Sequence, residues 1–105
     1  MAKDGHICDS FAEKIIDDWL GDRDIEHKRH FKYGQTKFTA DFFIKPDLLI
    51  EFFGLSGVSR HYDGNIALKR ALSKRLGLQL IELYPKDIFP TNKLDRNLNM
   101  VLKSP

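Results

Sequence analysis

The sequence predicts an α/β sandwich with a mixed four-stranded sheet and the element order α-β-β-β-α-β-α. Three observations lead to this fold class. Apolar residues recur at helical spacing in three segments, shorter apolar runs typical of strands lie between them, and Gly or Pro stands at most of the boundaries. Because the connection through the second helix is a crossover, the last strand is expected to lie parallel to one of the first three.

The N-terminal half is predicted to form one helix followed by the start of an antiparallel meander. Apolar side chains at helical spacing follow Ser10, and Gly21 stands where a helix commonly ends. Residues 25–32 are expected to form a polar strand near a sheet edge. A turn at Tyr33-Gly34-Gln35 then leads into a second strand, Lys37 to Lys45.

The middle of the chain is predicted to hold the most deeply buried strand and the second helix. A tight turn at Pro46-Asp47 precedes residues 48–53, which are so apolar that both faces of this third strand should be covered. Residues 62–76 suit a helix that ends at Gly77. A fourth apolar strand follows over residues 78–83.

The end of the chain is predicted to be a linker and a short amphipathic helix. Pro85 and Pro90 frame the linker. The apolar positions of the helix are Leu94, Leu98, Val101 and Leu102.

The length and composition indicate one domain, residues 1–105. A chain of 105 residues with 42% hydrophobic residues can bury one modest core. No apolar run approaches the roughly 18 residues of a membrane span, and no signal-peptide pattern opens the chain. The single Cys8 cannot form an internal disulfide. A cytoplasmic protein without membrane association is therefore expected.

Basic residues gather in two segments, which is more informative than the net charge of +2. One lies around residues 27–32 and the other around residues 69–75. Such clusters can contact nucleic-acid phosphates, although solvated faces of a strand and a helix explain them as well. The candidate nucleic-acid-binding residues are Lys28, Arg29, Lys32, Lys37 and Arg70.

Two carboxylates fall opposite each other in the predicted hairpin. If the chain turns about Pro46, residues equally far from it face each other, which places Asp41 opposite Glu51. Opposed side chains share a face with Cβ atoms about 5 Å apart, so the two charges repel unless a cation lies between them. Both acids stand in apolar segments, where unpaired charge is costly. Mg²⁺ or Mn²⁺ is the expected cofactor. The alternative is that each acid is exposed at a strand end or paired with Arg or Lys.

Glu13 is a third candidate ligand. The spacing Ser10-x-x-Glu13 is also that of a capping box, in which the two side chains bind free N–H groups at a helix start. A glutamate in the first turn could equally reach a metal site at the sheet edge. Both interpretations remain open.

Three short motifs follow one another in the order of the expected elements: Ser10-x-x-Glu13, Ala40-Asp41-Phe42, and Ile50-Glu51-Phe52-Phe53-Gly54-Leu55. Asp4-Gly5-His6 precedes them, and Tyr62 and Lys69 follow. Over roughly residues 4–88, this succession resembles the PD-(D/E)XK nuclease superfamily. More narrowly, it is similar to the compact nuclease domains of the very-short-patch-repair-like and helicase-associated type. The resemblance implies a three-layer, restriction-endonuclease-like core.

The resemblance also implies hydrolysis of a phosphodiester bond. Asp41, Glu51 and the backbone carbonyl of Phe52 would be metal ligands, with Glu13 as an auxiliary ligand or orienting group. One position departs from the pattern, because Phe53 stands where the usual motif has a lysine.

A basic or proton-accepting group is therefore expected from another element. Some members of the superfamily supply the lysine from the following helix, which favours Lys69, with Tyr62 two turns away on the same face. Lys69 could instead be a surface lysine and Tyr62 a packing residue. His61, expected in the loop after the third strand, is a second choice as general base, although a loop histidine is more often merely exposed.

The favoured function is a metal-dependent nuclease, a DNA endonuclease or nickase, with DNA preferred to RNA as substrate. The alternative is a catalytically inactive nucleic-acid-binding or interaction module with a nuclease fold, which Phe53 favours. The opposed acids Asp41 and Glu51 argue against that alternative. Because a domain this small has little surface for base recognition, a homodimer or a larger nuclease or helicase protein is the expected context.

Overall fold

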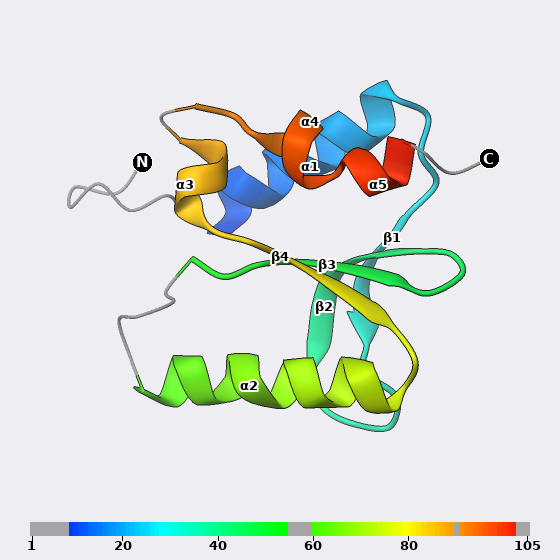
Figure 1. Cartoon of the computed structure of the whole chain (residues 1–105), viewed down its shortest axis with the longest axis vertical. Helices are drawn as coiled ribbons and strands as arrows, with labels where there is room; N and C mark the ends of the chain where they lie inside the picture. The colour runs from blue at the N-terminus through cyan, green and yellow to red at the C-terminus, as the bar shows by residue number, and fades with distance from the viewer. Residues whose placement is uncertain (1–8, 55–59, 90, 103–105) are drawn as a thin grey trace.

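A mixed sheet with the strand order β1-β2-β3-β4 lies at the centre of the molecule (Figure 1). It belongs to a computed structural model that describes residues 9–54, 60–89 and 91–102. The first three strands run antiparallel, and β4 lies parallel to β3, as the sequence predicts for a strand that returns through a helix. The strands are β1 (Lys28–Lys32), β2 (Thr39–Ile44), β3 (Leu48–Phe52) and β4 (Gln79–Leu83).

Helices cover both faces of this sheet. Helix α2 (Arg60–Arg75) lies on one face, and α1 (Asp9–Asp22) lies on the other with three short helices (Figure 1). These are α3 (Pro85–Ile88), α4 (Leu94–Asn97) and α5 (Asn99–Leu102). The described part of the chain is thus a compact α/β domain with an open, mixed four-stranded sheet. None of its described helices has the length and apolar character needed to cross a membrane.

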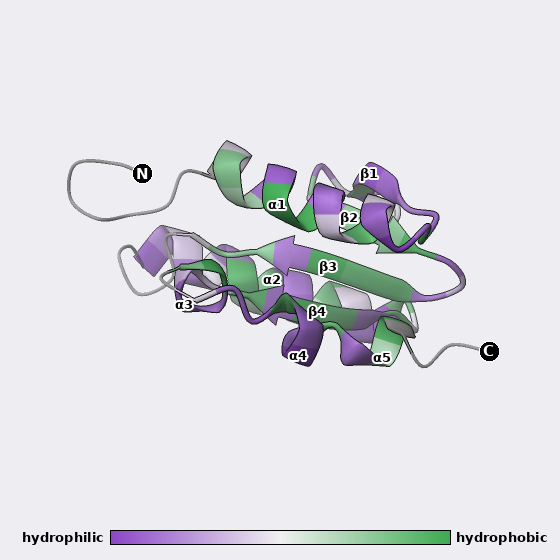
Figure 2. Ribbon diagram, turned by 90° about the horizontal axis from the view of Figure 1, so that it is seen from above, coloured by the Kyte–Doolittle hydropathy of each residue, from purple (hydrophilic) through white to green (hydrophobic). Residues whose placement is uncertain are grey.

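The sheet separates two hydrophobic clusters. The cluster on the α1 side includes Ile16, Phe42 and Ile50, and the cluster on the α2 side includes Phe43 and Leu49. Every residue of β3 is buried because both of its faces are covered, which confirms the prediction for this strand. In Figure 2 most of β3 is coloured hydrophobic, whereas the edge strand β1 is mostly hydrophilic. The predicted polar edge strand is therefore also confirmed.

Both long helices end in the same hydrogen-bond pattern. In α1 the residue with positive φ is Asp24 (φ 55°), and the Ile25 N–H donates to the Leu20 carbonyl at 3.0 Å. The helix consequently passes through Gly21, where the sequence predicted its end. In α2 the residue with positive φ is Gly77 (φ 73°), and the helix ends there as predicted.

The segment after β4 departs from the prediction. Residues 85–88 form the short helix α3 rather than a linker, because Pro85 suits the first turn of a helix and the Asp87 carboxylate accepts the Tyr84 N–H at 2.8 Å. The last predicted helix is divided at Leu98 into α4 and α5. Its buried apolar positions, including Leu94 and Leu98, nevertheless face the core as expected.

Candidate active site

The hairpin register brings Asp41 and Glu51 to neighbouring positions of β2 and β3. Phe42 pairs with Ile50 and Phe43 with Leu49, so residues equally far from Pro46 do face each other. One step beyond Phe42 and Ile50, the Asp41 carboxylate accepts the Phe52 N–H at 2.8 Å. The predicted register is confirmed as far as Phe42 and Ile50, and the Asp41 side chain beyond it reaches across to the end of β3.

A backbone irregularity in β1 lies beside Asp41. His30 has φ 55°, and the residue pairs between β1 and β2 skip the His30–Asp41 position. Residues two apart in a regular strand share a face, yet the Arg29 guanidinium lies 4.8 Å from the Phe42 ring whereas Phe31 stacks on Phe43. The left-handed residue reverses the alternation, and Asp41 stands where the regular β1–β2 pairing is interrupted.

Glu51 is almost completely buried, with 2% of its surface exposed. Its Oε2 atom accepts a hydrogen bond from the Tyr33 hydroxyl at 2.7 Å and lies 2.8 Å from the Lys69 Nζ. The Lys69 ammonium also donates to the Thr39 carbonyl at 3.0 Å. Burial raises the pKa of Glu51, and the hydrogen bonds from Lys69 and Tyr33 oppose this rise.

Asp41 is held in a setting with too little positive charge. Burial, together with the nearby Glu51 and Glu13 carboxylates, raises the pKa of Asp41 to about 7, against the lowering effect of the Phe52 N–H. The Lys69 charge also lowers this pKa, but it acts on two carboxylates at once. One ammonium therefore faces two acids, and the site can take up further positive charge.

These groups line a pocket of about 220 Å³ between the sheet and α2. Asp41, Glu51 and Lys69 contribute its charged side chains. Phe53, which is 3% exposed, packs edge-on against Tyr62 with ring centroids 6.4 Å apart. Tyr62 and Lys69 thus lie on the same face of α2 and line the same pocket, while Phe53 forms part of its wall. The other lining residues are Phe38, Phe52, Asn65 and Ile66.

Two predicted site residues lie elsewhere. Glu13 does not line the pocket, and its Oε1 lies 2.5 Å from a guanidinium nitrogen of Arg29. Ser10 lies within α1, and the residues before Asp9 are outside the described ranges, so the capping box stays a prediction. His61 belongs to the first turn of α2 rather than to a loop, is exposed, and does not line the pocket.

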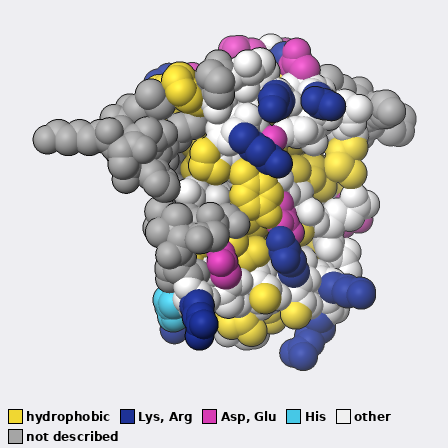
Figure 3. All heavy atoms as spheres, turned by 60° about the vertical axis from the view of Figure 1, so that its left-hand side comes forward, with side chains coloured by type: hydrophobic (Ala, Val, Ile, Leu, Met, Phe, Trp, Pro, Cys, Tyr) yellow, Lys and Arg dark blue, Asp and Glu magenta, His cyan; other side chains and the backbone are white. Residues whose placement is uncertain are grey.

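The predicted nucleic-acid-binding residues lie in two different settings. Lys28, Lys32 and Lys37 are exposed on β1 and on the turn that follows it. Arg29 and Arg70 are engaged by carboxylates, since Arg70 binds Glu82 through two nitrogens, each at 2.7 Å. Figure 3, which brings the left side of Figure 1 forward, shows basic side chains dispersed around a central hydrophobic strip.

Tyr33 contacts a proposed ligand directly, and the sequence did not indicate it. It was interpreted only as the start of a turn, and its backbone does make that turn through the Tyr33 carbonyl and the Thr36 N–H. Its side chain is fully buried and carries the hydroxyl that binds Glu51. A possible signal was the lone aromatic among polar turn residues, since a buried acid on the neighbouring strands needs a donor.

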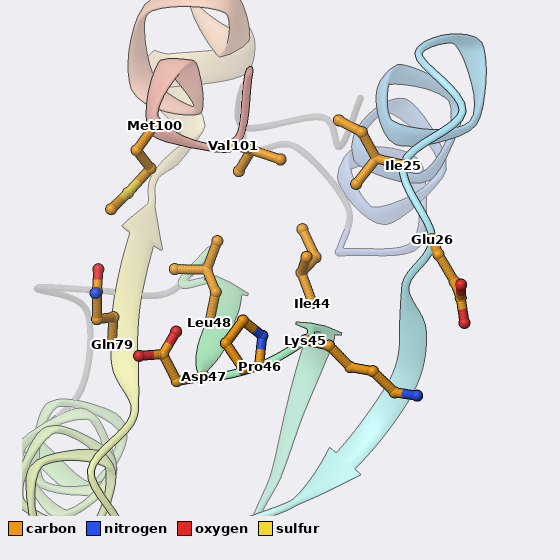
Figure 4. Close-up of a pocket in the computed structure, with 10 residues that line it drawn as sticks. All are labelled: Ile25, Glu26, Ile44, Lys45, Pro46, Asp47, Leu48, Gln79, Met100 and Val101. Atoms are coloured by element: carbon orange, nitrogen blue, oxygen red, sulfur yellow. The ribbon is translucent and has the colours of Figure 1, made fainter. Parts of the chain in front are cut away.

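A larger hollow of about 480 Å³ lies at the opposite end of the sheet, near α5 and the turn between β2 and β3 (Figure 4). Ile44, Leu48 and Val101 are among its apolar lining residues. The side chains of Glu26 and Lys45 turn away from it in Figure 4. Its acidic lining residues Glu26 and Asp47 lie on opposite sides of it in Figure 4 and do not form a pair, so the candidate active site is the smaller pocket.

Two parts of the family resemblance, Asp4-Gly5-His6 and Leu55, lie outside the described residues. Within the described ranges, no group of three or more His, Cys, Asp and Glu side chains is arranged to hold a metal ion. Comparisons of the chain with protein-family models, curated proteins and solved structures find no match.

Proposed function

We propose that this chain is a metal-dependent nuclease with a restriction-endonuclease-like arrangement, which hydrolyses phosphodiester bonds in DNA. The observation that carries the proposal is the shared position of Asp41, Glu51 and Lys69 on one pocket. A divalent cation beside two acids would stabilise negative charge on a phosphate and favour ionisation of a bound water.

The donor set suits a hard cation with few protein ligands. Two carboxylates line the pocket, the backbone carbonyl of Phe52 would add a third oxygen donor, and Mg²⁺ usually keeps several waters in addition. The raised pKa of Asp41 supports the same assignment, because burial and the neighbouring carboxylates disfavour its charge and a bound cation would offset both effects. Asp41 and Glu51 are therefore the proposed ligands, and Glu13, bound to Arg29, is at most an indirect contributor through its charge.

Lys69 supplies the positive group that the usual motif places at the position of Phe53. Its Nζ lies 2.8 Å from Glu51, which is within hydrogen-bond reach of the proposed ligand. From there the ammonium can donate to a phosphate oxygen or orient the attacking water. A Phe side chain at the motif position then costs no activity, because its role in the pocket is packing against Tyr62.

The test is incubation of the chain with plasmid, single-stranded DNA and RNA in Mg²⁺, Mn²⁺ or EDTA. We expect cleavage with either metal and none in EDTA, and Asp41→Asn or Glu51→Gln should abolish it. Glu26→Gln, at the opposite hollow, is the matched control and should cleave normally. Salt-dependent DNA binding with no cleavage in any metal would instead favour an inactive nucleic-acid-binding module.

A further inference from the structure

The two donors to the Glu51 carboxylate differ in what else they can reach. Lys69 lies on the pocket surface with a side chain that is 18% exposed, and it also bonds to the Thr39 carbonyl. Tyr33 is fully buried and does not line the pocket. Both bind the same atom, Oε2 of Glu51. One donor can therefore be shared with a ligand in the pocket, and the other cannot.

Resting on the proposed function, we propose that Tyr33 is a positioning residue. It holds the Glu51 carboxylate in its metal-binding orientation, so that Lys69 is able to turn toward a substrate phosphate. Without a second donor, Glu51 would lose its orienting contact whenever Lys69 moved. Groups that bind the ligands of a metal fix their orientation in this way.

The surroundings of Tyr33 make it a rigid support. Its N–H donates to the Phe38 carbonyl at 3.0 Å, and the Thr36 hydroxyl donates to its own carbonyl at 2.8 Å. The ring belongs to the buried cluster that also contains Phe43 and Leu49.

The neighbouring strand provides a control group that also combines a tyrosine, a glutamate and a basic side chain. The Tyr84 hydroxyl donates to the Glu82 carboxylate, and Arg70 completes that group from α2. Glu82 pairs with Glu51 across β3 and β4, but neither Glu82 nor Tyr84 lines the pocket. Tyr84→Phe thus removes a hydroxyl from a carboxylate outside the pocket and keeps the ring that packs against Phe53.

The experiment is a titration of the metal-free chain with Mn²⁺ alone, followed by electron paramagnetic resonance. Tyr33→Phe should weaken Mn²⁺ binding about 10-fold or more. Tyr84→Phe should stay within about twofold of the unmodified chain. Equal or tighter Mn²⁺ binding by Tyr33→Phe would overturn the role of Tyr33 while leaving the proposed function intact. No Mn²⁺ binding by the unmodified chain would overturn both.

A second variant tests the same inference without altering the buried ring. Lys69→Met should bind Mn²⁺ as tightly as the unmodified chain or more tightly, because Tyr33 still holds Glu51 and a positive charge has been removed. Adding Tyr33→Phe to this variant should then cause a larger loss than in the unmodified chain. Loss of Mn²⁺ binding in Lys69→Met alone would show that the lysine, and not Tyr33, holds the carboxylate.

Discussion

In the metal-free protein, the free energy of unfolding of Asp41→Asn should exceed that of the unmodified chain by an amount that grows as the pH rises. The pKa of Asp41 is raised from an ordinary 3.8 to about 7 in the folded state, so the folded protein holds a proton that the unfolded chain releases. The stability that this proton contributes is complete below about pH 4 and is lost as the pH rises through about 7. Asn, which does not titrate, retains it.

The magnitude follows from the size of the shift. A difference of about three pKa units corresponds to at most about 4 kcal/mol, since each unit is about 1.4 kcal/mol. Asp41 is only partly buried, and water in the pocket should reduce the gain to the order of 2 kcal/mol. Asn can still accept the Phe52 N–H, so the hydrogen bond is kept.

The assay is urea unfolding in EDTA at several pH values between about 4 and 8, followed by circular dichroism. Glu26→Gln, at the opposite hollow, is the control for removing a carboxylate. A stability difference between Asp41→Asn and the unmodified chain that stays constant or shrinks as the pH rises would refute the reasoning. Added Mn²⁺ should reverse the order above pH 7 by stabilising the unmodified chain alone.

Three further outcomes are expected. Lys69→Ala should lower the cleavage rate by a factor on the order of 10², whereas His61→Ala, on the exposed first turn of α2, should cleave normally. The opposite result would assign the catalytic role of Lys69 to His61. Replacing both Lys28 and Lys32 with Ala should weaken DNA binding uniformly across sequences, and the slope of affinity against salt concentration should fall as expected for the loss of about two phosphate contacts. Unchanged affinity would exclude β1 from the interface. Gly77→Ala should destabilise the fold by about 1 kcal/mol in urea unfolding, because φ is 73° there; no loss would mean that the helix end rearranges.

The sheet could be predicted because local patterns determine it. The apolar run 48–53 and the turn at Pro46 define the central hairpin, and one assumption about that turn gives the observed pairs from Ile44–Leu48 to Phe42–Ile50. The polar strand at residues 28–32 could only be an edge. The C-terminal helices were harder to predict from the sequence, because Pro85 is equally compatible with a linker and a helix start.

The contacts that complete the site could not be predicted in the same way. Lys69 is 18 residues from Glu51 in sequence, and only its place on the α2 face suggested that the two could meet. Tyr33 reaches the same carboxylate from a turn, where no periodicity applies. Arg29 and Glu13 bind each other, which draws Arg29 away from a phosphate and Glu13 away from a metal ion. That contact depends on tertiary distances that the sequence does not contain.

The arrangement of charge across the sheet gives a physical reason why one pair of acids is suited to a cation and its neighbour is not. On β4, Glu82 meets Arg70 in a bidentate pair, which lowers the pKa of Glu82 and satisfies one carboxylate with one cation. On β2 and β3, Lys69 is the cation among the described residues that acts on both Asp41 and Glu51, and burial raises the pKa of each carboxylate. Both pairs lie under the same helix, so the difference comes from the deeper burial of Asp41 and Glu51 and from the number of acids for each cation. A divalent ion is therefore expected to bind beside Asp41 and Glu51 rather than at Glu82.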